Sequence, residues 1–244
     1  MDVKIIHFYP DLMNLYGGWA NVAVLRRHLE DLGHSVTVEA VVPGKTADLT
    51  GADFLYLGAG TERAQKAALE DLRQYGPALE AAVSGGAAVL FAGTAMDLLG
   101  QTITDKEGTV YRGLGLAEFS TVQGPKRFVE DVYGFTDLYP EPVVGFMNKS
   151  SVTAGVEHPL LKELKMGIGN EGPDTPEGYC RGTLLASQLT GPLLVKNPKL
   201  LDTVVEAIYR RRGEALPENR PAYPDEARSY AVTAEQLRLR WDKQ

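Results

Sequence analysis

The chain has 244 residues, 44% of them hydrophobic and 23% charged, which is enough to bury a sizeable core as one large or two small domains. Its formal net charge is −7, and apart from residues 210–212 the basic residues are scattered, which argues against a nucleic-acid-binding face. No apolar run approaches the roughly 20 residues that span a bilayer, and the single cysteine excludes an intramolecular disulfide and a cysteine-rich metal site. We therefore expect a cytoplasmic protein in a reducing compartment.

Four strand patterns separated by helical patterns fill the first hundred residues. The expected strands are residues 3–8, 35–42, 53–57 and 87–92. One helix follows Gly17-Gly18 and ends at Gly33, a second begins at the capping residue Thr61, and a third follows Gly93. This alternation predicts an α/β fold with a mostly parallel open sheet and helices on both faces.

Shorter β-prone pieces replace this pattern after residue 100. They comprise residues 113–116, 119–122, 128–133, 143–146 and 151–153, and we expect them to add antiparallel strands. Residues 183–189 are typical of a late core strand. Residues 198–212 predict an amphipathic helix whose three terminal arginines complement the helix dipole.

The C-terminal segment differs in composition from the rest of the chain. Residues 214–224 hold three prolines and indicate an extended tether, whereas residues 225–244 are polar and helix-prone with few apolar anchors. We therefore expect one domain over residues 1–213, followed by a tail over residues 214–244. The helix of this tail is expected to be frayed or docked on a partner.

The junction between the strand at 87–92 and the following helix is the most informative feature of the sequence. A side chain at such a turn is exposed beside helix N-terminal N–H groups, which stabilise developing negative charge. A nucleophile would be expected there, but the residue at the turn is Gly93. The sequence therefore predicts a nucleophile elbow that lacks its nucleophile.

Several segments resemble the class I glutamine amidotransferase family, in its CobB/CobQ-like branch and most closely the GatD subunits of lipid II isoglutaminyl synthase. They are Asn14-Leu15-Tyr16-Gly17 with Asn21 and Leu25, the glycine loop from Gly58 to Gln65, Gly113-Leu114-Gly115-Leu116 with Arg127 downstream, and Gly191-Pro192. The resemblance spans about residues 4–212. It implies a flavodoxin-like three-layer fold.

The same resemblance implies a chemistry that this chain has lost. In the family, a cysteine thiolate activated by histidine attacks the glutamine amide, and backbone donors hold the oxyanion. Aligned on Gly100, the cysteine position is Gly93, a substrate-contacting glutamine is Asp97, and the histidine position is Thr190. Residues 145–149 also lack the usual glutamate and histidine of the family. Because neither glycine nor threonine can replace the thiol and its base, we expect no ordinary glutamine hydrolysis.

Candidate site residues remain, each with an alternative reading. The resemblance points to Gly58, Ala59, Gly60, Thr94, Asp97 and Arg127 as the substrate-binding set. Asp97 would suit a cationic or amine ligand, or it lies in the first turn of a helix, where the helix dipole favours a carboxylate. Thr94 is more simply a cap of that helix. Cys180 is a substitute nucleophile or a structural cysteine, and Arg127 binds an anion or lies in solvent.

Histidines add little to this set. His7 faces the crevice or lies in the core. The other three, His28, His34 and His158, are expected at surface or turn positions, too dispersed for a metal site. We expect neither a metal nor a cofactor.

Three functions are compatible with this pattern. In the first, a catalytically degenerate GatD-like subunit supports a Mur-ligase-like (MurT-like) amide ligase in peptidoglycan precursor amidation, the partner being implied by the resemblance. In the second, the chain is an active glutaminase or amidase that uses Cys180, Thr94 or Asp97. In the third, the old pocket senses a small ligand such as glutamine or an amine.

Overall fold

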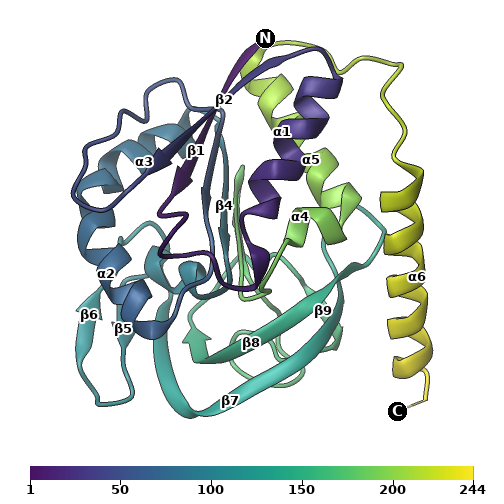
Figure 1. The fold of residues 1–244 in the computed structure, drawn as a ribbon. Helices are drawn as coiled ribbons and strands as arrows, with labels where there is room; N and C mark the ends of the chain where they lie inside the picture. The colour runs from purple at the N-terminus through teal and green to yellow at the C-terminus, as the bar shows by residue number, and fades with distance from the viewer. Residues whose placement is uncertain (244) are drawn as a thin grey trace.

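A six-stranded sheet forms the centre of the computed structural model, which describes residues 1–243 (Figure 1). The strands are β1 (Asp2–Phe8), β2 (Ser35–Val41), β3 (Phe54–Leu57), β4 (Ala88–Ala92), β10 (Tyr179–Arg181) and β11 (Leu184–Ser187), in the order β10-β11-β4-β3-β1-β2. All neighbours pair in parallel except β10, which runs antiparallel to β11. The predicted mostly parallel α/β fold is confirmed.

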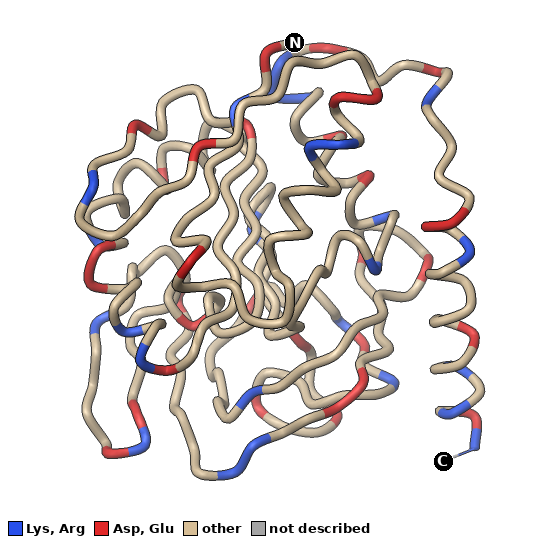
Figure 2. The backbone as a smooth tube through the Cα atoms, in the orientation of Figure 1, with Lys and Arg blue, Asp and Glu red and all other residues tan. Residues whose placement is uncertain are grey.

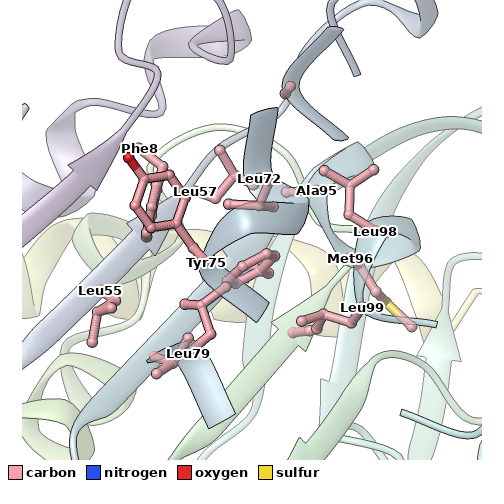
Figure 3. Packing of buried hydrophobic residues seen from close by; sticks show 14 of the residues in the cluster. Phe8, Leu55, Leu57, Leu72, Tyr75, Leu79, Ala95, Met96, Leu98 and Leu99 are labelled. Atoms are coloured by element: carbon pink, nitrogen blue, oxygen red, sulfur yellow. The ribbon is translucent and has the colours of Figure 1, made fainter. Parts of the chain in front are cut away.

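Helices cover both faces of this sheet. The helices α1 (Ala20–Asp31), α4 (Leu193–Lys196) and α5 (Pro198–Arg212) lie on one face, and α2 (Glu62–Leu72) and α3 (Gly76–Ser84) on the other (Figure 1). Successive strand residues point to opposite faces, so Ile5 packs with α1 and α5 while Ile6 packs with α2 and α3. Figure 3 shows the cluster on the side of α2 and α3, which contains Leu55, Leu57, Leu72 and Leu79.

The residues after β4 form a short 3-10 helix (Gly93–Leu99) in place of the expected α-helix. Its apolar side chains, Ala95, Met96, Leu98 and Leu99, join the core shown in Figure 3. The whole segment is therefore held tightly against the sheet edge. The same packing fixes the positions of its polar residues, Thr94 and Asp97.

A second sheet lies at the carboxyl end of the first. It contains β5 (Thr102–Thr104), β6 (Val110–Arg112), β7 (Ser120–Phe135), β8 (Val143–Ala154) and β9 (Glu163–Met166). All of its pairs are antiparallel except β5 with β7. The expected antiparallel additions are thus present, as a separate sheet.

The expected short pieces in this region join into longer elements. Residues 119–122 and 128–133 belong to the long strand β7, and residues 143–146 and 151–153 to β8. The register shifts between Gln123 and Phe128, where Pro125 has no N–H to donate. This interruption explains why the sequence pattern predicts two strands in place of one. The predicted strand at 113–116 is wrong, because these residues form a loop whose N–H groups bond to the carbonyls of residues 98–101.

The C-terminal helix α6 (Pro224–Trp241) follows residues 213–223, which carry no helix or strand. It packs against its own chain, so it is not frayed, whereas its docking on a partner stays a prediction. Tyr230, Ala234 and Leu237 recur at helical spacing and contact a cluster that contains Tyr133 and Val144. The division of the chain near residue 213 stays a prediction. None of the described helices combines the length and apolarity that crossing a bilayer requires.

Acidic and basic residues are interspersed along the backbone (Figure 2), and Asp53 is one of the few acidic residues that are buried. Asp53, at the start of β3, accepts hydrogen bonds from Arg211 at 2.7 Å and from Arg212 at 2.6 Å on each oxygen. It also accepts the backbone N–H of Lys4 at 3.0 Å. The arginines thus end α5 as expected, but two of them also fix that helix to the amino-terminal edge of the sheet.

Replacing this buried carboxylate should destabilise the fold. We expect Asp53→Asn to lower the free energy of unfolding by about 2–4 kcal/mol, because two partly buried guanidinium groups lose their anion. Urea denaturation measures the change. The control is Arg210→Gln, which removes an exposed arginine of the same run and should change stability by less than about 0.5 kcal/mol. Equal effects of the two substitutions would contradict the assigned role of Asp53.

Candidate functional site

A pocket of about 500 Å³ lies where the parallel strands end and the second sheet begins. Loops after β1, β3, β4 and β11 form one side of it, and β7 and β8 form the other. In open α/β sheets, ligands bind outside the carboxyl ends of the strands. The pocket therefore occupies the place where such a fold puts its site. Of the predicted site residues, it brings together Ala59, Gly60, Thr94, Asp97, Arg127 and Thr190.

Gly93 lies at the turn after β4, behind the lining of this pocket. Its backbone is left-handed, with φ of +62°, the strained conformation of a nucleophile elbow. A Cβ built on Gly93 would lie 2.7 Å from the Cβ of Ala59 and 3.3 Å from Cγ2 of Thr190. Two methyl groups therefore occupy the space that a side chain at position 93 would need.

The glycine loop after β3 is tied to the residue that follows the elbow. The Gly60 N–H donates to Oγ1 of Thr94 at 2.9 Å, and the Thr94 hydroxyl donates back to the Gly60 carbonyl at 3.0 Å. The N–H of Gly60 is thus engaged within the protein and does not point at a ligand oxyanion. The expectation that Thr94 caps the helix is wrong, since its hydroxyl is committed to this loop and the 3-10 helix has no side-chain cap.

Asp97 forms part of the pocket floor and is 1% exposed. Its two oxygens accept hydrogen bonds from Gln65 Nε2 at 2.9 Å and from Gln188 Nε2 at 2.6 Å. Burial raises the pKa of Asp97 to about 6, and the amide hydrogen bonds oppose that shift. Its placement in a helix first turn for the dipole is wrong, because the side chain points into a buried polar network.

Two further buried charges adjoin Asp97. Lys149 on β8 is 2% exposed and donates to the Gly169 carbonyl at 2.5 Å. Glu177 is fully buried and accepts hydrogen bonds from the Ser187 hydroxyl and the Gln188 N–H. Burial lowers the pKa of Lys149 and raises the pKa of Glu177, while the attraction of Lys149 to both carboxylates opposes both shifts.

This buried network was not anticipated from the sequence. Gln65 and Lys149 lie inside segments that resemble the family, but Gln123, Glu177 and Gln188 carry no pattern that distinguishes them from surface residues. Gln123 donates its Nε2 to Gln65 Oε1 at 2.8 Å, while its own Oε1 is buried without a partner in the described part of the chain. Only the folded chain brings these side chains together.

The pocket mouth is formed by a chain of polar contacts. Arg127 is half exposed and donates to Oδ1 of Asn148 at 2.8 Å, and Asn148 donates to the Tyr16 hydroxyl at 2.8 Å. Tyr16 has a left-handed backbone with φ of +60°, an uncommon conformation for a residue with a bulky side chain. Arg127 also lies 3.8 Å from a carboxylate oxygen of Glu62, so its guanidinium is fixed at the mouth from two sides.

Other candidates lie outside the pocket. Gly58 is glycine for a packing reason, since a Cβ there would meet the Met13 carbonyl at 2.6 Å. Cys180 is part of β10, and burial raises the pKa of its thiol, which disfavours a reactive thiolate. His7 is buried beside Tyr56, and desolvation lowers its pKa to about 4.

The remaining histidines do not gather into a site. His28 is buried and not at the surface, because Tyr223 stacks on its ring and Glu226 bonds its Nε2. His158 is exposed. Within residues 1–243, no group of three or more histidine, cysteine or carboxylate side chains could hold a metal ion.

The parallel sheet, the elbow and the pocket between them define the class I glutamine amidotransferase fold. The chain belongs to the CobB/CobQ-like glutamine amidotransferase domain family, whose model matches residues 4–198. A crystal structure of a glutamine amidotransferase shares the fold, with a TM-score of 0.53 at 18% identity over 83% of this chain and 98% of that one.

Two curated relatives are similar over most of their length. The chain is 28% identical over 212 residues to the GatD subunit of lipid II isoglutaminyl synthase (glutamine-hydrolyzing) from Staphylococcus aureus (strain N315), covering 87% of this chain and 86% of the relative. It is 27% identical over 227 residues to the subunit of the same name from Streptococcus pneumoniae (strain ATCC BAA-255 / R6), covering 92% and 86%.

Removing the charge of Asp97 should change how stability depends on pH. Because its pKa is about 6 in the fold and 3.8 ordinarily, the folded protein holds a proton that the unfolded chain has lost between about pH 4 and pH 6. Stability from this group therefore falls as the pH rises through that window, by up to about 3 kcal/mol. We expect Asp97→Asn to flatten this slope, because the new side chain does not titrate. The protein should remain folded, since the Gln188 amide can turn its unpartnered Oε1 toward the new Nδ2.

Urea denaturation at pH 4.5, 6 and 7.5 measures this effect. The control is Glu107→Gln, which neutralises an exposed carboxylate outside the pocket lining and should leave the slope unchanged. A slope in Asp97→Asn as steep as in the unmodified protein would show that Asp97 does not titrate in this range.

Proposed function

We propose that this chain is a catalytically inactive, GatD-like amidotransferase subunit. It would bind and support a Mur-ligase-like amide ligase that amidates a peptidoglycan precursor. Family membership and the two GatD relatives support the subunit role. The surroundings of Gly93 support the loss of activity. A cytoplasmic heterodimer with that ligase follows from the same proposal.

The filled space at the elbow is the observation that carries the loss of activity. Glutamine hydrolysis by this fold needs a nucleophile on the elbow, a base beside it and free N–H donors for the oxyanion. Here position 93 has no side chain, and the methyl groups of Ala59 and Thr190 stand where one would go. The N–H of Gly60 is bonded to Thr94. Since all three requirements are affected, restoring one residue would not restore the site.

Relocated catalysis has weaker support. Cys180 lies on β10 outside the pocket, and the Thr94 hydroxyl is held by Gly60. Asp97 is the remaining candidate, as a carboxylate that could activate water. Both of its oxygens already accept amide hydrogen bonds in a buried network, which suits a binding role better than proton transfer to solvent.

The ligase of this proposal is a MurT-like protein, the partner that the family resemblance implies. A ligase paired with an inactive amidotransferase subunit would draw on free ammonia or another amine. This chain would then contribute stability or regulation.

A stepwise restoration tests the loss of activity. We expect the unmodified protein to release no ammonia from glutamine, alone or with a MurT-like partner. Gly93→Cys alone should lower the free energy of unfolding by about 1–3 kcal/mol, because its Cβ meets Ala59 in a left-handed backbone. Adding Ala59→Gly should recover much of that loss, since it removes the methyl group in the way.

Urea denaturation and an ammonia-release assay follow the series, with Thr190→His added last to supply a base. Ala59→Gly in the unmodified background is the matched control and should not stabilise the protein. Ammonia release by the unmodified chain that survives Cys180→Ala and Asp97→Asn would refute the inactive subunit and these two relocated sites together.

Association with a ligase is tested by co-purification. A tagged copy of this chain, expressed with a MurT-like protein, should elute with it as a single species in size-exclusion chromatography. We expect amide formation by the ligase with ammonium, but not with glutamine, as nitrogen source. A chain that stays separate from the MurT-like protein at micromolar concentration would count against the supporting role.

A further inference from the structure

The floor of the pocket and the buried network behind it carry an unbalanced charge. Asp97 and Lys149 line the pocket, whereas Glu177 lies behind the lining and is joined to Asp97 through Gln188. The three side chains are 1%, 2% and 0% exposed, and they comprise two carboxylates and one ammonium. With all three ionised, this group has one negative charge without a cation. An uncompensated charge removed from water is costly, so it is relieved either by a proton or by a positively charged group that enters the pocket.

The hydrogen-bonding groups left over at the floor are acceptors, which also favour a positively charged donor. Gln123 lines the pocket, is 5% exposed and leaves its Oε1 without a partner among the described residues. Asp97 accepts two amide hydrogen bonds and, as a carboxylate, retains further lone pairs. The N–H of Gly60 is bonded to Thr94, so the loop after β3 offers one donor fewer to a carbonyl. The floor therefore suits a donor such as an ammonium better than an amide.

The mouth has the opposite charge. Arg63, Lys106 and Arg127 line it together with one carboxylate, Glu62, which lies 2.7 Å from the Lys106 ammonium. Three cations and one anion leave a net charge of +2, on a chain whose overall formal charge is −7. Arg127 donates one hydrogen bond to Asn148 and lies 3.8 Å from Glu62, and with five N–H donors its guanidinium keeps capacity for a planar anion.

We propose that this pocket binds a small zwitterion in a fixed direction, with an ammonium group at the floor between Asp97 and Gln123 and a carboxylate at the mouth on Arg127. The ligand class is an ω-amino acid or an α-amino acid whose side chain ends in an amine. The ammonium brings the floor to neutrality, with two cations facing two carboxylates. The volume of about 500 Å³ accommodates a molecule of this size.

The ligand class rests on the proposed function in one respect, since a pocket that still hydrolysed glutamine would have to bind an amide. The proposed function and the ligand class can nevertheless be refuted independently. Ammonia release from glutamine tests the loss of activity, whereas ligand affinity is measured by calorimetry without any turnover. A protein that is inactive but binds glutamine best would keep the proposed function and overturn this inference.

Isothermal titration calorimetry at pH 7.5 tests the ligand class with 5-aminopentanoate, L-lysine and L-glutamine as probes. We expect 5-aminopentanoate or L-lysine to bind at least tenfold more tightly than L-glutamine. Binding should weaken at least tenfold in Asp97→Asn, which the stability argument above expects to remain folded. Binding should also weaken below about pH 6, because a proton on Asp97 then neutralises the charge that attracts the ligand ammonium. Lys149 and Glu177 are the other charged groups next to Asp97, and neither makes direct contact with the ligand in this proposal.

A second pair of probes tests the direction of binding. Arg127→Gln should weaken 5-aminopentanoate at least fivefold but leave pentylamine, which has no carboxylate, unchanged. Asp97→Asn should weaken both. No binding of either amine probe, an affinity for L-glutamine equal to that for L-lysine and 5-aminopentanoate, or unchanged affinity in Asp97→Asn would each overturn the proposal.

Discussion

The close approach of the β3 loop to the residue after β4 determines how much space the elbow has for a side chain. Strands β3 and β4 are neighbours in register, so the loop that leaves β3 must pass the turn that leaves β4. Ala59 puts a methyl group into that crossing, and Gly93 is the residue that tolerates it. The left-handed backbone of an elbow is kept while the space for its side chain is closed. Glycine adopts this left-handed conformation without the steric cost that a larger side chain would have.

The crowding at the elbow does not extend to the rest of the pocket. Apolar side chains would fill an unused pocket at less cost, since unpaired polar groups in a core are costly. Here the floor keeps seven connected polar side chains: Gln65, Asp97, Gln123, Lys149, Glu177, Ser187 and Gln188. They come from six separate segments of the chain, so their juxtaposition depends on the entire fold.

Local patterns were sufficient for the parts of this structure that local chemistry determines. Thr61 as a helix cap, α5 over residues 198–212 and the four N-terminal strands follow from capping, periodicity and apolar runs. The joining of two short patterns into β7 was missed because Pro125 interrupts a strand that the partner β8 keeps in place. Likewise, the docking of α6 on Tyr133 and Val144 depends on contacts between distant segments. Asp97 shows the same limit at the site, since its position was anticipated but its burial and its amide partners were not.

The energetics of Asp97 connect stability with function. Its raised pKa means that the ionised form is disfavoured by burial at neutral pH. Asp53, by contrast, is as deeply buried but meets two arginines, so its charge is fully compensated and holds α5 in place. One carboxylate therefore serves the fold, at the amino-terminal edge of the sheet. The other is kept at the carboxyl edge, against stability, in the pocket wall where a ligand could balance it.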